Sequence, residues 1–246
     1  MRSSSRAGRR PVLSAWRTIP GPPRDRVKAR LLRLYRALST AFGPQRWWPG
    51  RTPYEIAVGA VLTQYTTWRN AARAVAALRA RRLLTPDRLL ALPAAELAAL
   101  IRPAGTYRSK AHRLRTMTRW LTTRFNGRFT PMRRAPLLAL RREMLTVPGL
   151  GPETVDAILL YAAGRPVFVA AAYLRRILAR HRLLPAKATY EEARTFMEKH
   201  LPSDPALFNE FHALIVAIAK SNCRTIPLCA TCPLRFDLRG RKPARA

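Results

Sequence analysis

The feature that most constrains the fold of this chain is a short turn rich in Pro and Gly between two stretches of helical periodicity. The residues VPGLGPET (147–154) place Gly149 and Gly151 between a helix expected to end at Val147 and a helix expected to begin at Pro152. Glycine permits positive φ angles and the close approach of another backbone, and proline is tolerated in the first turn of a helix. Free N–H groups at the new helix start then point outward together, which favours anion binding. An ordinary Gly-Pro turn is the alternative.

The rest of the chain repeats this pattern of helical blocks bounded by Pro or Gly. Apolar residues recur at three-to-four spacing from Val27 to Phe42, and Gly43-Pro44 is expected to end that helix. Further helices are expected from Pro53 onward and near residues 68–82, 86–93, 95–101, 109–124, 136–147, 152–163, 170–181, 189–201 and 205–221. Because strand-like alternation is nearly absent, the sequence predicts an all-α fold.

A large excess of positive charge points to a polyanionic partner. The 246 residues include 46 Lys and Arg against 13 Asp and Glu, a formal net charge of +33. Codon bias can explain the choice of Arg over Lys but not the scarcity of acids, so nucleic acid is the first candidate. No apolar run reaches the roughly 18–20 residues that cross a bilayer, and the basic N-terminus lacks the apolar block of a secretory signal. We therefore expect a cytoplasmic, nucleoid-associated monomer with no membrane partner.

Several segments together resemble one protein family. The hairpin and the stretch GPETVDAILLYAAGRPVFVAAAYLRRI that continues it resemble the helix-hairpin-helix and Gly/Pro-rich loop of the endonuclease III superfamily of DNA glycosylases. They are most similar to the endonuclease III-related branch, which includes some alkylbase glycosylases. TPYEIAVGAVLTQYTTW, IRPAGTYRSKAHRL and FHALIVAIAKSNC are similar to other family segments, so the likeness spans roughly residues 27–238.

The resemblance implies two helical lobes that flank a DNA-binding cleft. A six-helix barrel is expected over residues 52–164, with the helix-hairpin-helix at about 138–163, and an iron-sulfur lobe over residues 25–51 plus 165–240. Residues 1–24 are expected to form a flexible basic arm, with an incidental leader or a mis-called start as the alternative. Trp47 and Trp48 are expected to anchor a contact between the lobes, and His212 to be a core histidine.

The resemblance also implies how duplex DNA is held. Gln64 stands where the family places the glutamine that enters the gap left by an extruded base; helix capping or a core role is the alternative. Thr106 falls near the family's wedge position, which is usually larger and apolar, and this departure weakens a wedging role. Contacts with the DNA backbone, which carry no base specificity, are expected from Tyr107, Arg108, Lys110, Gly149, Leu150, Gly151, Thr154, Arg175 and Arg176.

Two positions depart from the family's chemistry. Glycosidic cleavage builds positive charge on the deoxyribose, and a nearby carboxylate stabilises it. By the resemblance, that Asp falls at Ala171, whose methyl group can neither accept a proton nor screen a cation. The lysine that forms a Schiff base in bifunctional members falls at Glu153, so no lyase activity is expected. Three explanations stay open: Glu153 or Asp156 takes over, the protein binds lesions without cutting, or Ala171 is an engineered change.

A C-terminal run of three cysteines predicts a metal centre. Cys223, Cys229 and Cys232 resemble the family's [4Fe–4S] loop, and an odd, clustered set in a reducing compartment favours metal or cluster ligation over disulfides. Such a cluster usually takes four thiolates. The family's fourth cysteine would lie near Leu238, and the neighbouring Asp237 is expected to be the fourth ligand. A Zn²⁺ site, a three-iron cluster and an empty loop are the alternatives.

The sequence thus predicts a base-excision-repair protein that binds damaged or abnormal duplex DNA. Any glycosylase activity is expected to be weak or narrow and monofunctional. The rival prediction is a non-catalytic protein that recognises DNA damage or structure. A general nucleoid-type protein ranks last, because it leaves the hairpin and the cysteine spacing unexplained.

Overall fold

A computed structural model describes residues 24–246, and the ordered elements in this part of the chain are all helical. The predicted all-α fold is therefore confirmed. The predicted arm at residues 1–24 lies outside the described residues, except for Arg24, which begins the first helix. The helices are α1 (Arg24–Phe42), α2 (Pro53–Leu62), α3 (Trp68–Ala80), α4 (Pro86–Ala91), α5 (Ala94–Leu100), α6 (Tyr107–Phe125), α7 (Leu137–Leu145), α8 (Pro152–Ala157), α9 (Ala172–Arg180), α10 (Tyr190–His200) and α11 (Pro205–Ser221).

Short non-α segments complete the described elements. These are the 3-10 turns Arg102–Ala104, Thr130–Arg133 and Arg235–Leu238, and a π-helical segment, Ile158–Ala162, that continues α8. Capping explains several of the helix starts. Thr52 accepts a 3.1 Å hydrogen bond from the Glu55 amide ahead of Pro53, and Thr189 forms a capping box with Glu192. No helix among the described residues is long and apolar enough to span a membrane.

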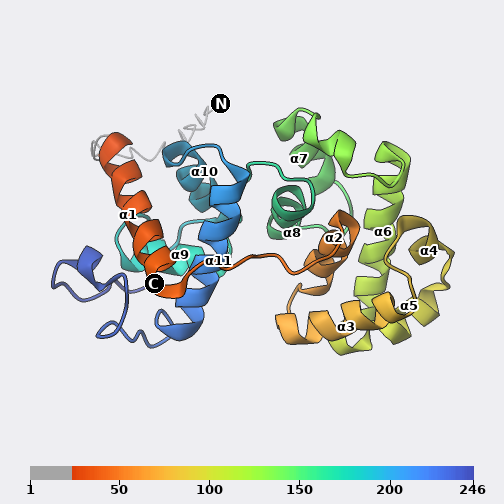
Figure 1. The fold of residues 1–246 in the computed structure, drawn as a ribbon, viewed down its shortest axis with the longest axis horizontal. Helices are drawn as coiled ribbons and strands as arrows, with labels where there is room; N and C mark the ends of the chain where they lie inside the picture. The colour runs from red at the N-terminus through yellow and green to blue at the C-terminus, as the bar shows by residue number, and fades with distance from the viewer. Residues whose placement is uncertain (1–23) are drawn as a thin grey trace, which may run out of the picture.

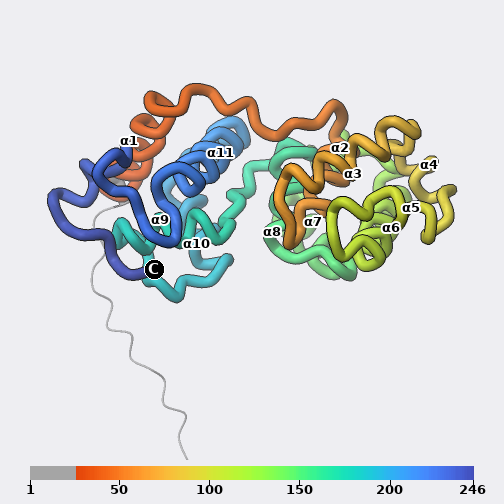
Figure 2. The backbone as a smooth tube through the Cα atoms, turned by 90° about the horizontal axis from the view of Figure 1, so that it is seen from below, coloured from red at the N-terminus to blue at the C-terminus, as the bar shows by residue number. Residues whose placement is uncertain are grey.

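The helices form two groups (Figure 1). Helices α1, α9, α10 and α11 pack together on one side, and α2 to α8 pack together on the other. The chain crosses between the groups twice, once after α1 and once before α9 (Figure 2). The second crossing leads directly into Ala171, the residue that precedes α9 and that stands at the predicted position of the family's carboxylate.

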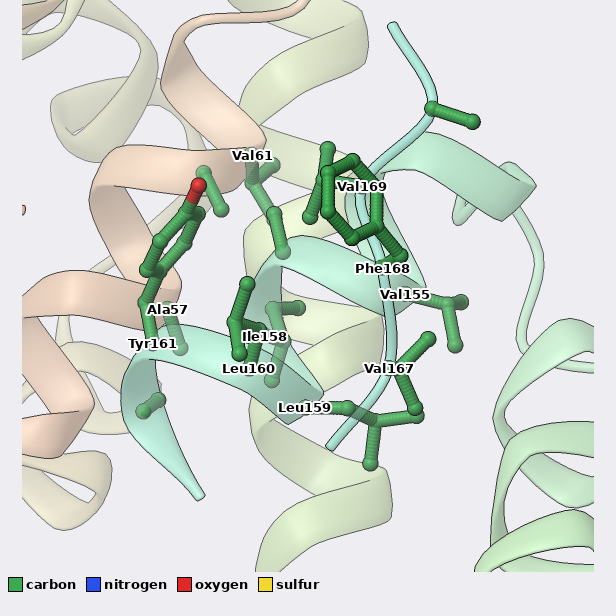
Figure 3. Packing of buried hydrophobic residues seen from close by; sticks show 14 of the residues in the cluster. Ala57, Val61, Val155, Ile158, Leu159, Leu160, Tyr161, Val167, Phe168 and Val169 are labelled. Atoms are coloured by element: carbon green, nitrogen blue, oxygen red, sulfur yellow. The ribbon is translucent and has the colours of Figure 1, made fainter. Parts of the chain in front are cut away.

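The second crossing is fixed by burial. Val167, Phe168 and Val169 are buried and run beside the π-helical segment and α2, as Figure 3 shows. The Phe168 ring also lies 5.2 Å from the Phe208 ring of α11, so this segment packs against both groups. Full burial of such a side chain stabilises a fold by about 1.5–3 kcal/mol. The backbone at residues 167–170 is thus held firmly between the two groups.

Aromatic residues fill a second junction between the groups. The Trp48 ring lies 5.2 Å from the Tyr161 ring and 5.2 Å from the Trp68 ring. The Tyr161 hydroxyl and His212 Nδ1 are 2.5 Å apart, which joins the π-helical segment to α11. Burial lowers the pKa of His212 to about 4, so its ring is neutral at pH 7. These positions match the predicted core histidine and the predicted contact between the lobes.

Candidate functional site

The hairpin between α7 and α8 uses its two glycines differently. Gly149 has a φ of +87°, and a Cβ atom there would lie 2.4 Å from Cγ of Arg113, so only glycine fits. Gly151 has a φ of −83° and open space where a Cβ would stand. The amides of both glycines lack a hydrogen-bond partner among the described residues. Both amides are therefore available to an anion, and anion binding at this hairpin stays a prediction.

The Leu150 side chain, between the two glycines, points into the protein. It is buried in the core, and its amide donates to the Val147 carbonyl at 3.1 Å. Leu150 was expected to contact DNA, but in the structure it anchors the hairpin between the two exposed glycines. The structure therefore gives Leu150 a role in the shape of the turn, and its buried side chain is not available for the predicted contact.

Gln64 is held against the hairpin by three hydrogen bonds. Its Nε2 donates to the Gly149 carbonyl at 3.1 Å and to Thr154 Oγ1 at 2.8 Å. Its Oε1 accepts from Arg113 Nη1 at 2.6 Å. The structure thus brings together Gln64, Gly149 and Thr154, three residues predicted for the site. Arg113 was missed: it lies on α6, 49 residues after Gln64, and nothing in its local sequence signals this contact.

Lys110 corrects the sequence prediction. Its side chain is fully buried, and its ammonium donates to the carbonyl oxygens of Leu62 at 2.9 Å and Ala104 at 2.7 Å. Burial lowers the pKa of this lysine. The ammonium does not reach a phosphate in this conformation. Instead, it ties the end of α2 to the turn before α6.

The neighbours of Lys110 fit the expected DNA contacts better. Arg108 is exposed, and its guanidinium lies 5.9 Å from the centre of the Tyr107 ring. Tyr107 is half-buried and packs against the core. Arg108 is thus free to reach a backbone phosphate, while Tyr107 supports it.

Arg175 and Arg176, although adjacent in sequence, contact different parts of the structure. Arg176 donates to the Cys223 carbonyl at 2.6 Å, and its guanidinium lies 5.2 Å from the Tyr173 ring centre. This arginine supports the cysteine loop, contrary to the expectation that it contacts a phosphate. Arg175 lies near Glu153, whose pKa is raised by desolvation and only partly brought back by the charge of this arginine.

Ala171 leaves an apolar surface at the expected position of the acid. It is the N-cap residue of α9, it is 8% exposed, and it follows the fully buried Ala170. Its carbonyl accepts the Arg175 amide at 3.3 Å, so the start of α9 is well formed. The backbone at this position is ordered, but the side chain is a methyl group.

Glu153 is the more accessible of the two candidate replacement carboxylates. It lies exposed in the first turn of α8, one residue before Thr154. Desolvation by the surrounding residues raises its pKa, and the charge of Arg175 only partly opposes this. A carboxyl group with a raised pKa beside a binding hairpin is suited to general acid–base work.

Asp156 is held in a buried ion pair. Arg141 Nε donates to its Oδ1 at 2.6 Å, and the Tyr190 hydroxyl donates to its Oδ2 at 2.8 Å. Arg141 also donates to Glu191 at 2.5 Å. Because Tyr190 and Glu191 begin α10, this network joins α7 and α8 to the other group of helices. Its full burial gives Asp156 a structural role and no path to a substrate.

The three cysteines line one small cavity, together with Arg180, His181 and Leu238. Arg180 Nη1 lies 3.2 Å from Cys223 Sγ. Within residues 24–246, however, no group of three or more His, Cys, Asp or Glu side chains is placed to hold a metal ion. The structure therefore brings the predicted thiols to one cavity without arranging them as a metal site.

Asp237 does not line this cavity, contrary to the prediction that it is the fourth ligand. Arg30 donates to both of its carboxylate oxygens, at 2.7 and 2.6 Å, and His181 Nδ1 lies 2.8 Å from Oδ2. Burial favours the neutral acid, but these partners outweigh it and hold the pKa well below its usual range. The carboxylate is thus fully engaged, and the prediction of Asp237 as fourth ligand is wrong for this structure.

Comparison with known proteins agrees with this geometry. Residues 58–203 match the family described as HhH-GPD superfamily base excision DNA repair protein. A Methanocaldococcus jannaschii protein, provisionally named a DNA repair glycosylase, is 41% identical over 83% of this chain and 94% of its own length. A thymine/uracil-DNA glycosylase of Pyrobaculum aerophilum is 28% identical over 76% of this chain and 80% of its own.

A solved structure shows the same fold. An endonuclease III trapped as a covalent intermediate with DNA superposes with a TM-score of 0.72 and 22% identity, covering 85% of this chain and 94% of that one. The matched residues 58–203 contain Gln64, the hairpin and Ala171. The chain therefore belongs to the HhH-GPD superfamily of base excision DNA repair proteins.

Proposed function

We propose that the protein binds damaged or abnormal duplex DNA and releases a base slowly by hydrolysis, without lyase chemistry. The observation that supports this proposal is the joined set of Gln64, Arg113 and the hairpin, with the free amides of Gly149 and Gly151. These amides suit a backbone phosphate, and the net charge of +33 attracts the duplex. The relatives that carry glycosylase names support base release as the activity.

Glu153 is our candidate for the carboxylate that assists slow base release. In its ionised form its carboxylate accepts a proton from the attacking water and opposes the positive charge that develops on the sugar. A carboxyl group cannot form a Schiff base with the sugar, so no covalent imine and no strand cleavage are expected. Because Glu153 lies on α8 rather than at position 171, we expect a slow reaction and a narrow choice of substrate.

A second function, recognition without cleavage, is favoured by Ala171. A methyl group at this position removes the charge that the reaction requires, while the contacts that grip DNA stay in place. Such a protein binds its lesion and releases no base. The shape of the pocket determines which lesion is bound. Base release assisted by a carboxylate is chemistry common to several damaged bases.

We also propose that the cysteine loop holds a [4Fe–4S] cluster through three thiolates. The thiols of Cys223, Cys229 and Cys232 line the same cavity, so three cluster ligands would be close at hand, although in this structure they are not arranged as a metal site. The fourth family position is Leu238, which cannot ligate, so the fit is incomplete. When bound, the cluster would shape a basic loop near the DNA. Visible absorbance and iron content of purified protein test this; a colourless preparation that contains zinc contradicts it.

Base release is tested with duplexes that carry oxidised, deaminated or alkylated bases, followed by alkali to cut where a base is lost. We expect slow release from one class that disappears with E153Q. The control is E96Q, because Glu96 is also an exposed acid in the first turn of a helix. Selective binding with no release from any duplex supports recognition alone. Absence of binding to every duplex contradicts both functions.

A further inference from the structure

We propose that Tyr65 inserts its ring into the DNA base stack beside Gln64 and provides the wedge that Thr106 is too small to supply. This inference rests on the proposed binding of duplex DNA. Its ligand is the exposed face of a base next to a lesion or gap. The argument depends on the turn that carries Tyr65, on the exposure of its ring and on the place of this turn beside the hairpin.

The turn between α2 and α3 is rigid on both sides of Tyr65. Before it, the Thr63 hydroxyl donates to the Gly59 carbonyl at 2.7 Å. After it, the Thr66 amide donates to the Thr63 carbonyl at 3.3 Å, and Asn70 Nδ2 donates to Thr66 Oγ1 at 3.2 Å. Such a frame fixes the backbone at Tyr65, so the side chain leaves the turn in a defined direction.

Tyr65 is placed in an unusual way for an aromatic residue. Tyr65 is 93% exposed, more than any other large hydrophobic residue in the part of the chain that the structure describes. Its φ is +52°, in the left-handed region that favours glycine. Neither burial nor backbone preference explains a tyrosine here. Positions of this kind are typical of functional sites, where the strain is retained for a ligand.

The turn lies where DNA is expected. Gln64, the residue directly before Tyr65, donates to the Gly149 carbonyl of the hairpin. A strand whose phosphate is bound by the free hairpin amides therefore passes within reach of Tyr65. If Gln64 exchanges its hairpin hydrogen bonds for a base edge, amide and ring from adjacent residues act on the same step, Gln64 toward a base edge and Tyr65 toward a base face.

Lys110 connects this turn to the turn that carries Thr106. Its ammonium donates to the Leu62 carbonyl at the end of α2 and to the Ala104 carbonyl just before Gly105 and Thr106. Thr106 is exposed with a φ of +41°, and its side chain is too short to separate stacked bases. The two turns thus form one edge of the site, and Tyr65 supplies its large flat ring.

The chemistry of a phenol ring fits this role. Aromatic side chains stack on unpaired bases of any identity, and wedges inserted between base pairs stabilise a kinked duplex. The cost of unstacking is lowest at a damaged or abasic position. Tyr65 should therefore increase the preference for damaged over intact duplex, with little effect on affinity for intact DNA.

The test compares wild type, Y65A, Y65F and Y65W on two duplexes that differ only in one tetrahydrofuran abasic analogue. A 2-aminopurine beside the analogue reports unstacking through its fluorescence. We expect Y65A to weaken binding to the abasic duplex by about tenfold and to lose the fluorescence change, while the intact duplex is bound as before. Y65F and Y65W should retain both properties.

Two controls separate the ring from other effects. L138A removes a side chain that is 68% exposed on α7 and should change neither property. Y65G suits the positive φ, should keep the thermal stability, and should lose the preference as Y65A does. If wild type binds the abasic duplex and Y65A shows the same preference, the role of Tyr65 is disproved while the proposed function stands. If wild type binds neither duplex, the proposed function fails.

Discussion

The hairpin at residues 147–154 and the segment at residues 167–172 are neighbours in sequence but are built for different tasks. The hairpin brings polar groups together, because Gln64, Arg113 and Thr154 meet at Gly149, and it exposes two amides. The segment is packed on both sides, and it ends in three alanines. The first region offers the contacts that we propose for DNA, and the second has Ala171 where the family resemblance places a carboxylate.

From this difference we infer that DNA binding and base release depend on separate sets of contacts in this fold. Phosphate binding needs backbone amides and a fixed turn, and neither depends on the residue at position 171. In our proposal, fast base release needs a carboxylate at position 171, where the structure has the methyl group of Ala171 at the start of a well-formed α9. The following predictions test this separation in order of decreasing effect.

The network around Asp156 should be the largest contributor to stability among these contacts. D156N leaves the buried Arg141 with the half-exposed Glu191 as its remaining ionic partner, and we expect the free energy of unfolding to fall by about 3 kcal/mol. E191Q is the control, because Glu191 contacts the same arginine from a half-exposed position and should cost less than about 1 kcal/mol. Chemical denaturation measures both. Wild-type stability in D156N together with loss of base release would instead make Asp156 catalytic.

The two glycines of the hairpin should respond differently to alanine. G149A forces a positive φ on alanine and a clash with Arg113, so we expect a loss of about 1–3 kcal/mol in stability. G151A meets open space and should change stability by less than about 0.5 kcal/mol. Both should weaken duplex binding, G151A because its methyl group meets the approaching phosphate. Equal melting temperatures for the two variants would contradict the role given to Gly149.

The raised pKa of Glu153 gives a small effect with a defined sign. A carboxyl whose pKa is above its ordinary value of 4.5 in the folded state contributes most stability below pH 4.5 and loses it as pH rises through the raised value. E153Q should therefore match wild type in acid and exceed it at pH 7 by less than about 1 kcal/mol, since the group is exposed. E96Q should show no such trend. A stability loss in E153Q at pH 7 would contradict this.

Local sequence signals predicted the helices and the hairpin. Helix α11 spans residues 205–221, as expected, because Asp204 and Pro205 mark its start, and α8 begins at Pro152 for the same reason. The π-helical segment at 158–162 was not predicted, because its Ala163-to-Ile158 hydrogen bond forms in the packed helix and has no signature in sequence.

The roles predicted for two residues were wrong because their hydrogen-bond partners lie far away in the sequence. Asp237 pairs with Arg30, 207 residues away, and Lys110 with the Leu62 carbonyl, 48 residues away. Both look like free charged groups in sequence, because burial depends on elements that pack only in the fold. Tyr65 was passed over for a related reason, since exposure and positive φ are properties of the folded turn.

The most direct test of the account is to return the acid to position 171. A171D should raise the single-turnover rate of base release by about 10²–10⁴-fold while duplex affinity stays near that of wild type. A172D is the matched control, because it adds the same charge one residue later at an exposed position in the first turn of α9, where it should be tolerated. Equal rates for A171D, A172D and wild type would contradict the claim that this fold retains its grip on DNA and lacks only the carboxylate.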